Sequence, residues 1–581
     1  MNKTTCPLDC YDACSVLFEE GKLKGDQAHP VTKGYLCPNL NHYLSEPRIL
    51  KPRFKGQEIE MDEAMDILSK LLHEAQGLHT LYFKGEGNFG KLQNAPAHFF
   101  SQYGADFTKG SLCDGAGEAG VVEGRGESLV LPHEQIAKSN IVVVWGRNIS
   151  VSNSHFMDLI KNKILIVIDP IKTDLAKKAA VHLQVKPRED LFLALLMARF
   201  VYIEQIENYD FIENFTADFD YFVEFIRSFP VKELVERVGV ELEDVLTALM
   251  LMDKEKVVFL VGVGVQKYAH GSSVLRAIDS LAAMMGLFGK EGCGVSYLGN
   301  SSLGFKNIFP EGKKRVPKAT VNFAKYDLAF IQGSNPANQL PNSARVIDGL
   351  LKCKLSVYFG LYENETSRLA DLVIPAKNFL EKEDIRFSYG TDFIGRMPKL
   401  TESSIGISET ELTNRLCKDF GYDTLPDERK MIEEIVGNNV CEKEGYLQNA
   451  EYQQIPYSEG FYTDDEKFQF MDEYDDEACE GEGLFLITCK QRHSLNSQFK
   501  RDTHIYLPPV CGFEEGDSVR AVSPYGAVEF TVKIDENLRE DCVMIFSGTP
   551  GVNYLTPDEL SLEGESAIYQ ETRVVLERVD A

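Results

Sequence analysis

The chain has 581 residues, with 61 Lys and Arg against 89 Asp and Glu, so its formal net charge is −28. This length exceeds what one hydrophobic core can organise and predicts three or four domains. An acidic surface repels nucleic acid and anionic membranes, so we expect neither as a partner.

The start of the chain and its cysteines indicate the compartment. The first residues form no charged-then-apolar leader, and no apolar run is long enough to span a bilayer. We therefore expect a cytoplasmic protein without a direct membrane span. Thiols stay reduced in that compartment, so clustered members of the 13 cysteines are better explained as metal ligands than as disulfides.

The first forty residues contain such a cluster. Cys6, Cys10 and Cys14 follow one another at equal spacing, and Cys37 comes after a gap. On a helix Cys6 and Cys14 would lie about 12 Å apart, too far to ligate one centre, so we expect an irregular loop. Four thiolates suit a 4Fe-4S cluster or a structural zinc, and a run of three with a distant fourth favours the iron–sulfur cluster.

The segment after these cysteines predicts a helix, a strand and a glycine-rich loop. Asp62 is a candidate cap for an amphipathic helix that reaches Ala75. Residues 80–83 predict a strand that runs into Gly85-Glu-Gly87-Asn-Phe-Gly90, and Asp106 follows at a distance that suits a ribose contact. The stretch between shows no clear helix–strand return, so NAD binding here is disfavoured.

Strands and helices alternate from residue 140 onward. Strands that are apolar throughout, separated by amphipathic helices, predict a parallel sheet buried on both faces. The predicted strands cover residues 141–145, 164–168 and 257–261, with helices at 190–201 and 274–287, and strands at 328–331 and 355–359 predict a second α/β unit. An acidic stretch, 463–483, has the composition of a linker. It precedes short β patterns at 484–488, 518–522, 528–534 and 543–546, which predict a compact barrel.

Glycine and polar residues follow the predicted strands directly. Ligands of open α/β sheets bind at the carboxyl ends of strands, so these loops together are expected to hold one large polar ligand, or two. The residues concerned are Gly146, Asn148, Asp169, Pro170, Gly264, Gln266, Asn335 and Pro336.

Several short motifs resemble those of the molybdopterin oxidoreductases of the dimethyl-sulfoxide-reductase superfamily, in matching order over nearly the whole chain. Cys6-Pro-Leu-Asp-Cys10 resembles the 4Fe-4S segment of that family. The stretches similar to its pterin-dinucleotide loops are Trp145-Gly-Arg-Asn148, Ile168-Asp-Pro170, Pro187-Arg-Glu-Asp190, Ser334-Asn-Pro336 and Ala370-Asp-Leu-Val-Ile-Pro375. The last domain adds Lys490, Arg492 and His493 within residues 488–496, and Asn553 in Asn553-Tyr-Leu-Thr556.

The resemblance implies an α/β multidomain fold with a C-terminal β-barrel of the double-psi type. The implied domains are an iron–sulfur segment (1–53), a discontinuous α/β domain (54–139 and 301–462), an α/β dinucleotide-binding domain (140–300) and the barrel (483–581), which also binds a dinucleotide. The implied cofactors are a 4Fe-4S cluster on Cys6, Cys10, Cys14 and Cys37, and bis-molybdopterin guanine dinucleotide with Mo or W. Asp190, Lys490, Arg492, His493 and Asn553 join the strand-end residues as candidate cofactor-binding residues.

The resemblance also implies where the metal is bound. Cys113 lies in the glycine-rich stretch 110–120, where the family has its protein ligand to molybdenum or tungsten, and a thiolate suits a soft, sulfur-rich centre. Asp114 and Glu118 are the nearest ionisable groups in the sequence and are candidates to move protons. We therefore take Cys113, Asp114 and Glu118 as the candidate catalytic residues.

The chain departs from the family pattern in two places. Many relatives have Lys-Gly after the fourth cluster cysteine to link cluster and pterin, whereas this chain has Pro38-Asn39. Lys33, Lys51 and Asn39 itself are candidates to replace that link. Relatives that oxidise formate pair the metal ligand with an adjacent His, but Asp114 follows Cys113 here, which argues against formate dehydrogenase.

Together these features predict an oxidoreductase. It would convert a small-molecule substrate by two electrons at Mo or W, often with oxygen-atom transfer, and pass single electrons through the cluster to a ferredoxin-like protein or an iron–sulfur subunit. Two alternatives stay open, namely a non-redox hydratase or transhydroxylase on the same scaffold, and a non-catalytic electron-transfer subunit that has lost the metal.

Overall fold

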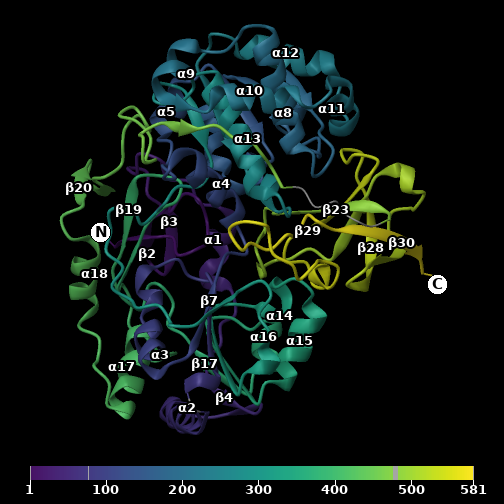
Figure 1. Ribbon diagram of the computed structural model, residues 1–581. Helices are drawn as coiled ribbons and strands as arrows, with labels where there is room; N and C mark the ends of the chain where they lie inside the picture. The colour runs from purple at the N-terminus through teal and green to yellow at the C-terminus, as the bar shows by residue number, and fades with distance from the viewer. Residues whose placement is uncertain (1, 76, 476–481, 580–581) are drawn as a thin grey trace.

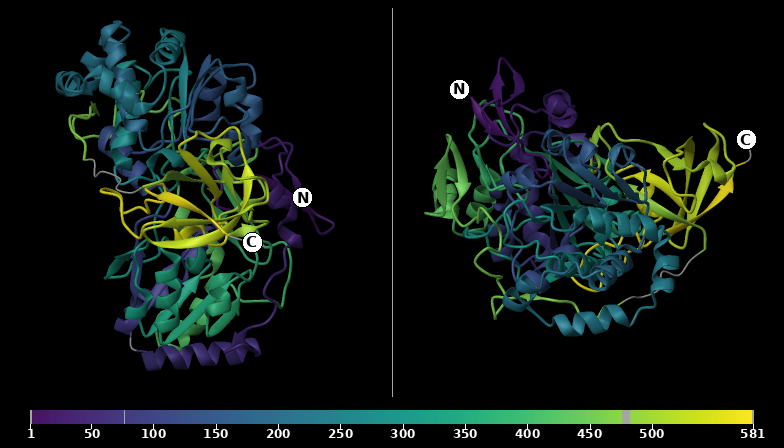
Figure 2. Two further views of the ribbon diagram at one scale, coloured as in Figure 1. Left: turned by 90° about the vertical axis from the view of Figure 1, so that its right-hand side faces the viewer. Right: turned by 90° about the horizontal axis from the view of Figure 1, so that it is seen from above.

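The computed structural model describes residues 2–75, 77–475 and 482–579. Two α/β units, a β-barrel and a small N-terminal segment make up the molecule (Figure 1). One unit, with the helices α8 to α13, lies at the top of that view and the other lies at the bottom, with the barrel to their right. Seen from the side, the barrel lies between the two units (Figure 2).

The N-terminal segment is a small antiparallel sheet with the cysteine loop inside it. Strands β1 (Lys3–Thr5), β2 (Ser15–Glu19) and β3 (Lys22–Gly25) pair in that order. Residues 6–14 connect β1 to β2 without a helix, as the cysteine spacing predicts. Cys37 caps the short helix α1 (Pro38–His42), where its sulfur accepts a hydrogen bond from the backbone N–H of Leu40 at 3.4 Å.

The lower unit is built on an eight-stranded sheet. Its order is β14-β7-β6-β15-β16-β17-β4-β5, and the six strands from β14 to β17 are parallel. Strands that precede residue 110 thus pair with strands that follow residue 310. The bounds are β4 (Arg53–Phe54), β5 (Gln57–Glu58), β6 (Thr80–Lys84), β7 (Asp106–Lys109), β14 (Arg315–Pro317), β15 (Leu328–Gln332), β16 (Leu355–Gly360) and β17 (Leu372–Pro375).

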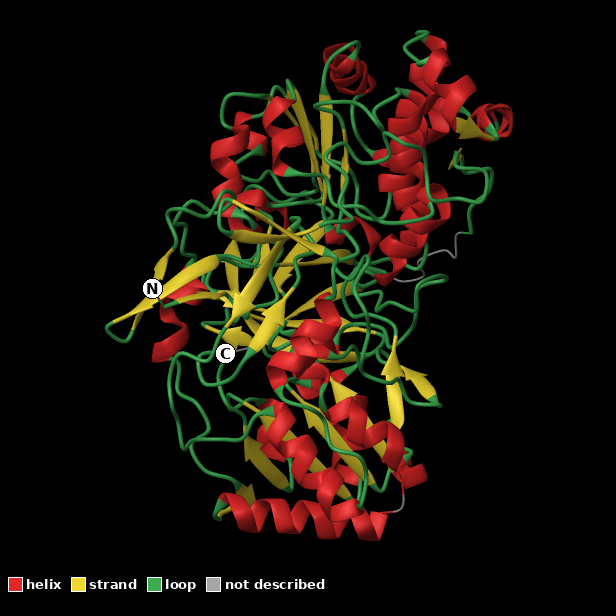
Figure 3. Ribbon diagram, turned by 90° about the vertical axis from the view of Figure 1, so that its left-hand side faces the viewer, coloured by secondary structure: helices red, strands yellow, loops and turns green. Residues whose placement is uncertain are grey.

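Helices cover both faces of this sheet, because its central strands are apolar on both sides. One face packs against α2 (Met61–Ala75), α3 (Pro96–Tyr103), α17 (Glu409–Phe420) and α18 (Glu428–Val436). The other packs against α14 (Pro336–Gln339), α15 (Ser343–Lys352) and the neighbouring α16 (Glu365–Leu369). Figure 3 shows these layers, with α2 along the bottom of the unit.

The upper unit contains a parallel five-stranded sheet of order β10-β9-β8-β12-β13. Its strands are β8 (Ile141–Trp145), β9 (Ile164–Ile168), β10 (Val181–Leu183), β12 (Val257–Val261) and β13 (Gly294–Ser296). Its helices are α5 (His133–Lys138), α6 (Ile149–Ser152), α7 (Met157–Ile160), α8 (Asp190–Ile203), α9 (Tyr209–Phe215), α10 (Phe219–Arg227), α11 (Val231–Val238), α12 (Leu242–Met252) and α13 (Gly271–Met284).

The C-terminal barrel is closed, as the short β patterns predict. Its order is β23-β29-β26-β28-β27-β30, and the pairs β23–β29 and β26–β28 are parallel. The bounds are β23 (Leu484–Cys489), β26 (His504–Leu507), β27 (Ser518–Ser523), β28 (Gly526–Ile534), β29 (Cys542–Phe546) and β30 (Arg573–Arg578). The fold class is therefore confirmed, and the division into domains stays a prediction.

A four-stranded antiparallel sheet of order β18-β19-β21-β20 lies beside the N-terminal segment. It consists of β18 (Asp384–Arg386), β19 (Phe393–Met397), β20 (Val440–Lys443) and β21 (Tyr446–Asn449). The hydroxyl of Thr5 donates a hydrogen bond to the carbonyl of Arg396 at 3.1 Å. A sheet far along the sequence thus supports the cysteine loop.

The sequence predictions were wrong at three points. Asp62 is not the helix cap, because α2 already begins at Met61. Helix α13 is shifted three residues towards the N-terminus, so that it begins after the loop that follows β12. The acidic stretch is more than a solvated linker, since β22 (Phe468–Gln469) pairs with β11 (Thr216–Ala217) and buries Phe468. Residues 476–481 of that stretch lie outside the described residues.

Helices α4 (Gly115–Arg125) and α13 cross closely in the upper unit. A Cβ atom at Gly120 would collide with the carbonyl of Ser272, so only glycine permits this approach. At the end of α4, Arg125 forms a buried ion pair with Asp279 of α13, with Nε 2.7 Å from Oδ2. This pair fixes the helix whose first turn follows Cys113. Over the described ranges, no helix is both long and apolar enough to cross a bilayer.

Replacing Asp279 by Asn is expected to lower the free energy of unfolding by about 3–5 kcal/mol, because it leaves the Arg125 charge buried without a counter-charge. The double variant Arg125→Met/Asp279→Leu removes both charges and is expected to lose less. Calorimetry of the purified variants measures the difference. Asp158→Asn, which breaks the exposed contact with Lys161, is the control and should change little. A double variant as unstable as the single one would contradict this account.

Candidate functional site

One cavity of about 980 Å³ lies where the two α/β units, the barrel and the cysteine loop meet. This volume is at the upper end for small-molecule sites and suits a large ligand. Most of the predicted site residues line it: Cys6, Cys10, Cys14, Cys37, Cys113, Asp114, Glu118, Gly146, Asn148, Asp169, Pro170, Asp190, Gly264, Asn335, Lys490, Arg492 and Asn553.

Three predicted cofactor-binding residues do not line the cavity. Gln266 is fully buried instead, and its side chain bridges the carbonyl of Cys113 (2.5 Å) and the N–H of Gly117 (2.9 Å). Pro336 begins helix α14, where its fixed backbone angle favours a first helical residue. His493 is exposed. Gln266 therefore positions the backbone of Cys113, the candidate metal ligand.

All four cysteines of the N-terminal segment line the cavity. Cys6 and Cys14 are buried, and the N–H of Cys6 donates to the carbonyl of Cys14 at 2.9 Å. Burial raises the pKa of Cys14 well above its usual value, and Asp12 and the other three thiols raise it further. Such thiols become thiolates readily only with a cationic partner. Among the residues that the structure describes, no three His, Cys, Asp or Glu side chains converge closely enough to hold a single metal ion.

Cys113 lies in a tight turn just before α4. The hydroxyl of Ser111 accepts the N–H of Cys113 at 2.9 Å and donates to the carboxylate of Asp114 at 2.6 Å. Burial raises the pKa of Cys113 to about 12, and Asp114 adds to this shift while Lys267 opposes it. One oxygen of the Asp114 carboxylate thus accepts from Ser111, and Cys113 and Asp114 both line the cavity.

Three lysines interact electrostatically with this turn, and the sequence analysis had named only Lys490. Burial lowers the pKa of both Lys267 and Lys318, and the Asp114 carboxylate partly restores each. Burial also lowers the pKa of Lys490, but Asp9, Cys113 and Cys10 more than offset it and the net pKa is raised. Lys267 directly follows a predicted strand-end loop, which was its only sequence signal, and Lys318 had none.

The three candidates to replace the family lysine differ in whether they line the cavity. Asn39 lines the cavity, and its amide donates to the carbonyl of Ser494 at 3.4 Å. Lys33 and Lys51 are exposed and do not line it, and Lys51 contacts Glu60 instead. Lys490 lines the cavity and interacts electrostatically with both Cys10 and Cys113, which the sequence did not predict.

Two equivalent loops approach the cavity from the two sheets. Gly146 follows β8 with φ +55°, and its N–H donates to the carbonyl of Ile168 on the next strand. Gly333 follows β15 with φ +54° and donates in the same way to Phe359. Positive φ is a conformation that glycine adopts without strain. An asparagine follows two residues later in both loops, so both sheets present the same backbone turn to the cavity.

Both buried carboxylates and lysines line the cavity. Asp169 and Asp190 are buried at the upper sheet, and burial raises the pKa of each to about 7. Asp169 accepts the N–H of Ile171 and Asp190 accepts the indole N–H of Trp145. Buried carboxylates suit the N–H edge of a purine-like base, and the lysines near Cys113 suit anionic groups. This donor set fits a large dinucleotide cofactor.

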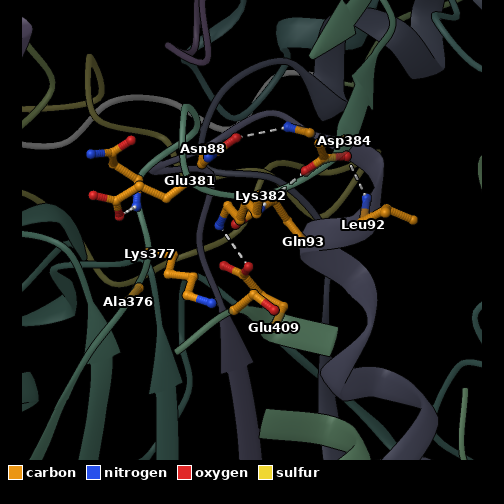
Figure 4. A network of polar contacts seen from close by, with 12 residues as sticks. Asn88, Leu92, Gln93, Ala376, Lys377, Glu381, Lys382, Asp384 and Glu409 are labelled. Atoms are coloured by element: carbon orange, nitrogen blue, oxygen red, sulfur yellow. Dashed lines mark hydrogen bonds and ion pairs between the residues drawn. The ribbon is translucent and has the colours of Figure 1, made fainter. Parts of the chain in front are cut away.

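A further polar group, absent from the sequence predictions, lies beside the lower sheet (Figure 4). Lys382 and Glu409 form an ion pair of 2.6 Å with both side chains nearly buried, and both line the cavity. Asp384 accepts hydrogen bonds from the N–H of Leu92 (2.8 Å) and from the amide of Gln93 (3.1 Å). These residues come from segments far apart in the sequence, so no motif indicates them.

Two other predicted residues connect the barrel to the lower unit. The Asn553 amide donates to the carbonyls of Asn338 (2.7 Å) and Gln339 (3.1 Å) in helix α14. The Asn335 amide donates to Glu365 (2.7 Å) and to Ser497 (3.1 Å). Both side chains therefore already have protein partners and position the cavity wall.

Comparison with known proteins identifies relatives along the whole chain. The family model for "Molybdopterin oxidoreductase" matches residues 56–398, and that for "Molydopterin dinucleotide binding domain" matches residues 511–572. The probable oxidoreductase YoaE of Bacillus subtilis (strain 168) is 25% identical and the match covers 99% of this chain and 98% of YoaE. The probable oxidoreductase YyaE of the same organism is 27% identical, covering 73% of this chain and 70% of YyaE.

A solved structure has the same fold. Acetylene hydratase from Pelobacter acetylenicus superposes with a TM-score of 0.85 over 100% of both chains, at 17% sequence identity. That identity shows the shared fold alone. The first family model spans more than half of the 581 residues, and it ends before the second begins in the C-terminal part of the chain. The chain therefore belongs to the molybdopterin oxidoreductase family, as its motifs predict.

Proposed function

We propose that the chain is a molybdenum- or tungsten-dependent oxidoreductase that couples a two-electron conversion of a small-molecule substrate to one-electron transfer through a 4Fe-4S cluster. One observation carries this proposal. A single cavity is lined by Cys113, by all four N-terminal cysteines and by the strand-end loops of both sheets. Both redox centres would then be held in the same cavity.

The paired loops support two copies of a dinucleotide rather than one. Gly146 and Gly333 make the same turn at equivalent strand ends, and ligands of open α/β sheets bind at such places. Asp169 and Asp190 would bind the base of one dinucleotide, and Lys267 and Lys490 would neutralise anionic groups near Cys113. When bound, the metal supplies the two-electron chemistry and the cluster supplies one-electron steps.

The remaining residues have roles that the chain itself performs. Ser111 and Gln266 fix the backbone on either side of Cys113 by hydrogen bonds, so that its sulfur is held in one place. The turn is partly buried, and the reduced contact with water strengthens its electrostatic interactions. Asp114 and Glu118 both line the cavity and are our candidates to carry a proton to or from the substrate.

A hydratase is the second candidate, because acetylene hydratase shares the fold over its full length. Turnover with artificial electron-accepting or electron-donating dyes separates the two, since a hydratase moves no net electrons. Retention of Cys113 at the cavity argues against a subunit that has lost its metal. The net charge of −28 supports a basic redox partner, and we propose a cytoplasmic location.

Replacing Cys113 by Ala is expected to abolish dye-linked turnover and to leave the iron–sulfur EPR signal intact, because the two centres use separate ligands. X-ray absorption should then show one sulfur fewer around Mo or W. Cys489→Ala is the matched control, since Cys489 lines the same cavity, and it should keep turnover. Full activity of the Cys113 variant would refute the assignment.

Replacing Cys10 by Ser is expected to remove the cluster and to destabilise the N-terminal segment, which has little core of its own. Protein purified without oxygen should contain about four irons per chain before the change and far fewer after it. The Cys353→Ser variant controls for general loss of a buried cysteine and should retain its iron. Stoichiometric zinc without iron in the wild type would contradict the cluster.

Replacing Asp114 by Asn is expected to leave the Mo or W content and the metal–sulfur distances unchanged, because Ser111 rather than the metal is the partner of this carboxylate. Elemental analysis and X-ray absorption check both quantities. Loss of the metal in this variant would instead make Asp114 a ligand.

A further inference from the structure

We propose that Arg386 is the positioning residue of the cysteine loop and the fixed positive charge that raises the reduction potential of the iron–sulfur cluster. This inference rests on the proposed function in one respect, namely that the four cysteines hold a 4Fe-4S cluster. Nothing in the sequence pattern indicated Arg386, which lies more than 370 residues from the loop that it contacts.

Arg386, the last residue of β18, reaches into the cysteine loop. Its Nη1 donates to the carbonyls of Cys6 (2.5 Å) and Leu8 (2.6 Å), and its Nη2 donates to the carbonyl of Cys10 (2.5 Å). A planar guanidinium offers its donors in a fixed fork, so one side chain sets the relative positions of all three carbonyls. These hydrogen bonds therefore hold the backbone between Cys6 and Cys10, two of the predicted cluster ligands.

Among the described residues, Arg386 has no counter-ion. The side chain is fully buried, and its Nε has no hydrogen-bond partner. Within residues 2–75, 77–475 and 482–579, no carboxylate forms an ion pair with it, whereas buried Arg125 pairs with Asp279 and buried Lys382 pairs with Glu409. Arginine stays protonated in proteins, and an uncompensated buried charge is costly.

A cluster held by four thiolates supplies the missing negative charge. The Arg386 guanidinium lies within hydrogen-bond distance of the carbonyls of two predicted cluster ligands, Cys6 and Cys10. The guanidinium therefore already favours negative charge at the cluster ligands. Because the site is buried, this attraction is screened less than it would be in water.

Reduction of the cluster adds one electron and changes no protein bond, so the reduced form carries one more negative charge. A fixed positive charge nearby stabilises the reduced form more than the oxidised form and raises the potential. The loop has other supports, since Ser388 donates to the carbonyl of Tyr11 (2.8 Å) and Tyr389 donates to Asp9 (3.1 Å). A variant without the charge can therefore keep the loop in place.

Two variants separate charge from positioning. Arg386→Gln keeps a hydrogen-bond donor and loses the charge, whereas Arg386→Lys keeps the charge and loses the fork. Each is purified as the full chain without oxygen, its iron is counted, and its cluster is titrated with dithionite while the EPR signal is recorded. We expect the Gln variant to retain iron with a more negative midpoint potential, and the Lys variant to return close to the wild-type potential.

The exposed Arg396 on β19 provides a matched control, since Arg396→Gln removes one charge from the same segment and should leave the potential unchanged. An unchanged potential in Arg386→Gln, or equal shifts in the Gln and Lys variants, overturns the charge role. If the Gln variant loses its iron, the Lys variant decides: iron retained at the wild-type potential supports the proposal, and iron lost overturns it. Wild-type protein without iron would instead refute the proposed cluster itself.

Discussion

The rest of the structure depends on the way in which two parallel sheets present the carboxyl ends of their strands to one cavity. Parallel strands must be buried on both faces, so their ends are the only part of each sheet that can meet a ligand. Gly146 and Gly333 turn the chain there with the same backbone conformation. The barrel and the cysteine loop complete the cavity walls between the two units.

Buried charge is tolerated in this molecule where it has a partner or a function. Arg125–Asp279 joins α4 to α13, and Lys382–Glu409 closes part of the cavity wall. Around Cys113 and the cysteine loop, however, several cations lack a protein carboxylate at ion-pair distance among the described residues, Arg386 being fully buried. Such a site is costly in the protein alone and suits anionic cofactors that compensate the charge.

Much of the fold could be predicted from local patterns. The apolar strands at 141–145 and 164–168 and the closed barrel follow from periodicity and turn residues alone. Helices α9 to α12 were missed because no motif lies in them, and β26 was missed because a four-residue strand gives little pattern. Strand β30 is longer, but only one of its residues is buried. The acidic stretch was misread because charge outweighed the few apolar residues, including Phe468, that pack into the core.

The part of the candidate site that lies in short motifs was predicted. Residues next to a motif, such as Cys113 and Asp169, were placed at the cavity, whereas Arg386, Lys318 and the Lys382–Glu409 pair act through contacts between distant segments and leave no local signal. Gln266 was predicted to bind the cofactor. Its loop does reach the cavity, but its side chain donates to the carbonyl of Cys113 instead. A single sequence gives the residue types, but it does not show which residues lie close together in space.

The central claim is that two equivalent strand-end loops bind two dinucleotides in one cavity. The most direct measurement is the guanine nucleotide released by acid hydrolysis from anaerobically purified protein, relative to the amount of chain. The account predicts about two guanine nucleotides per chain, one for each sheet. A value of about one, or none in protein that contains its metal, would contradict it.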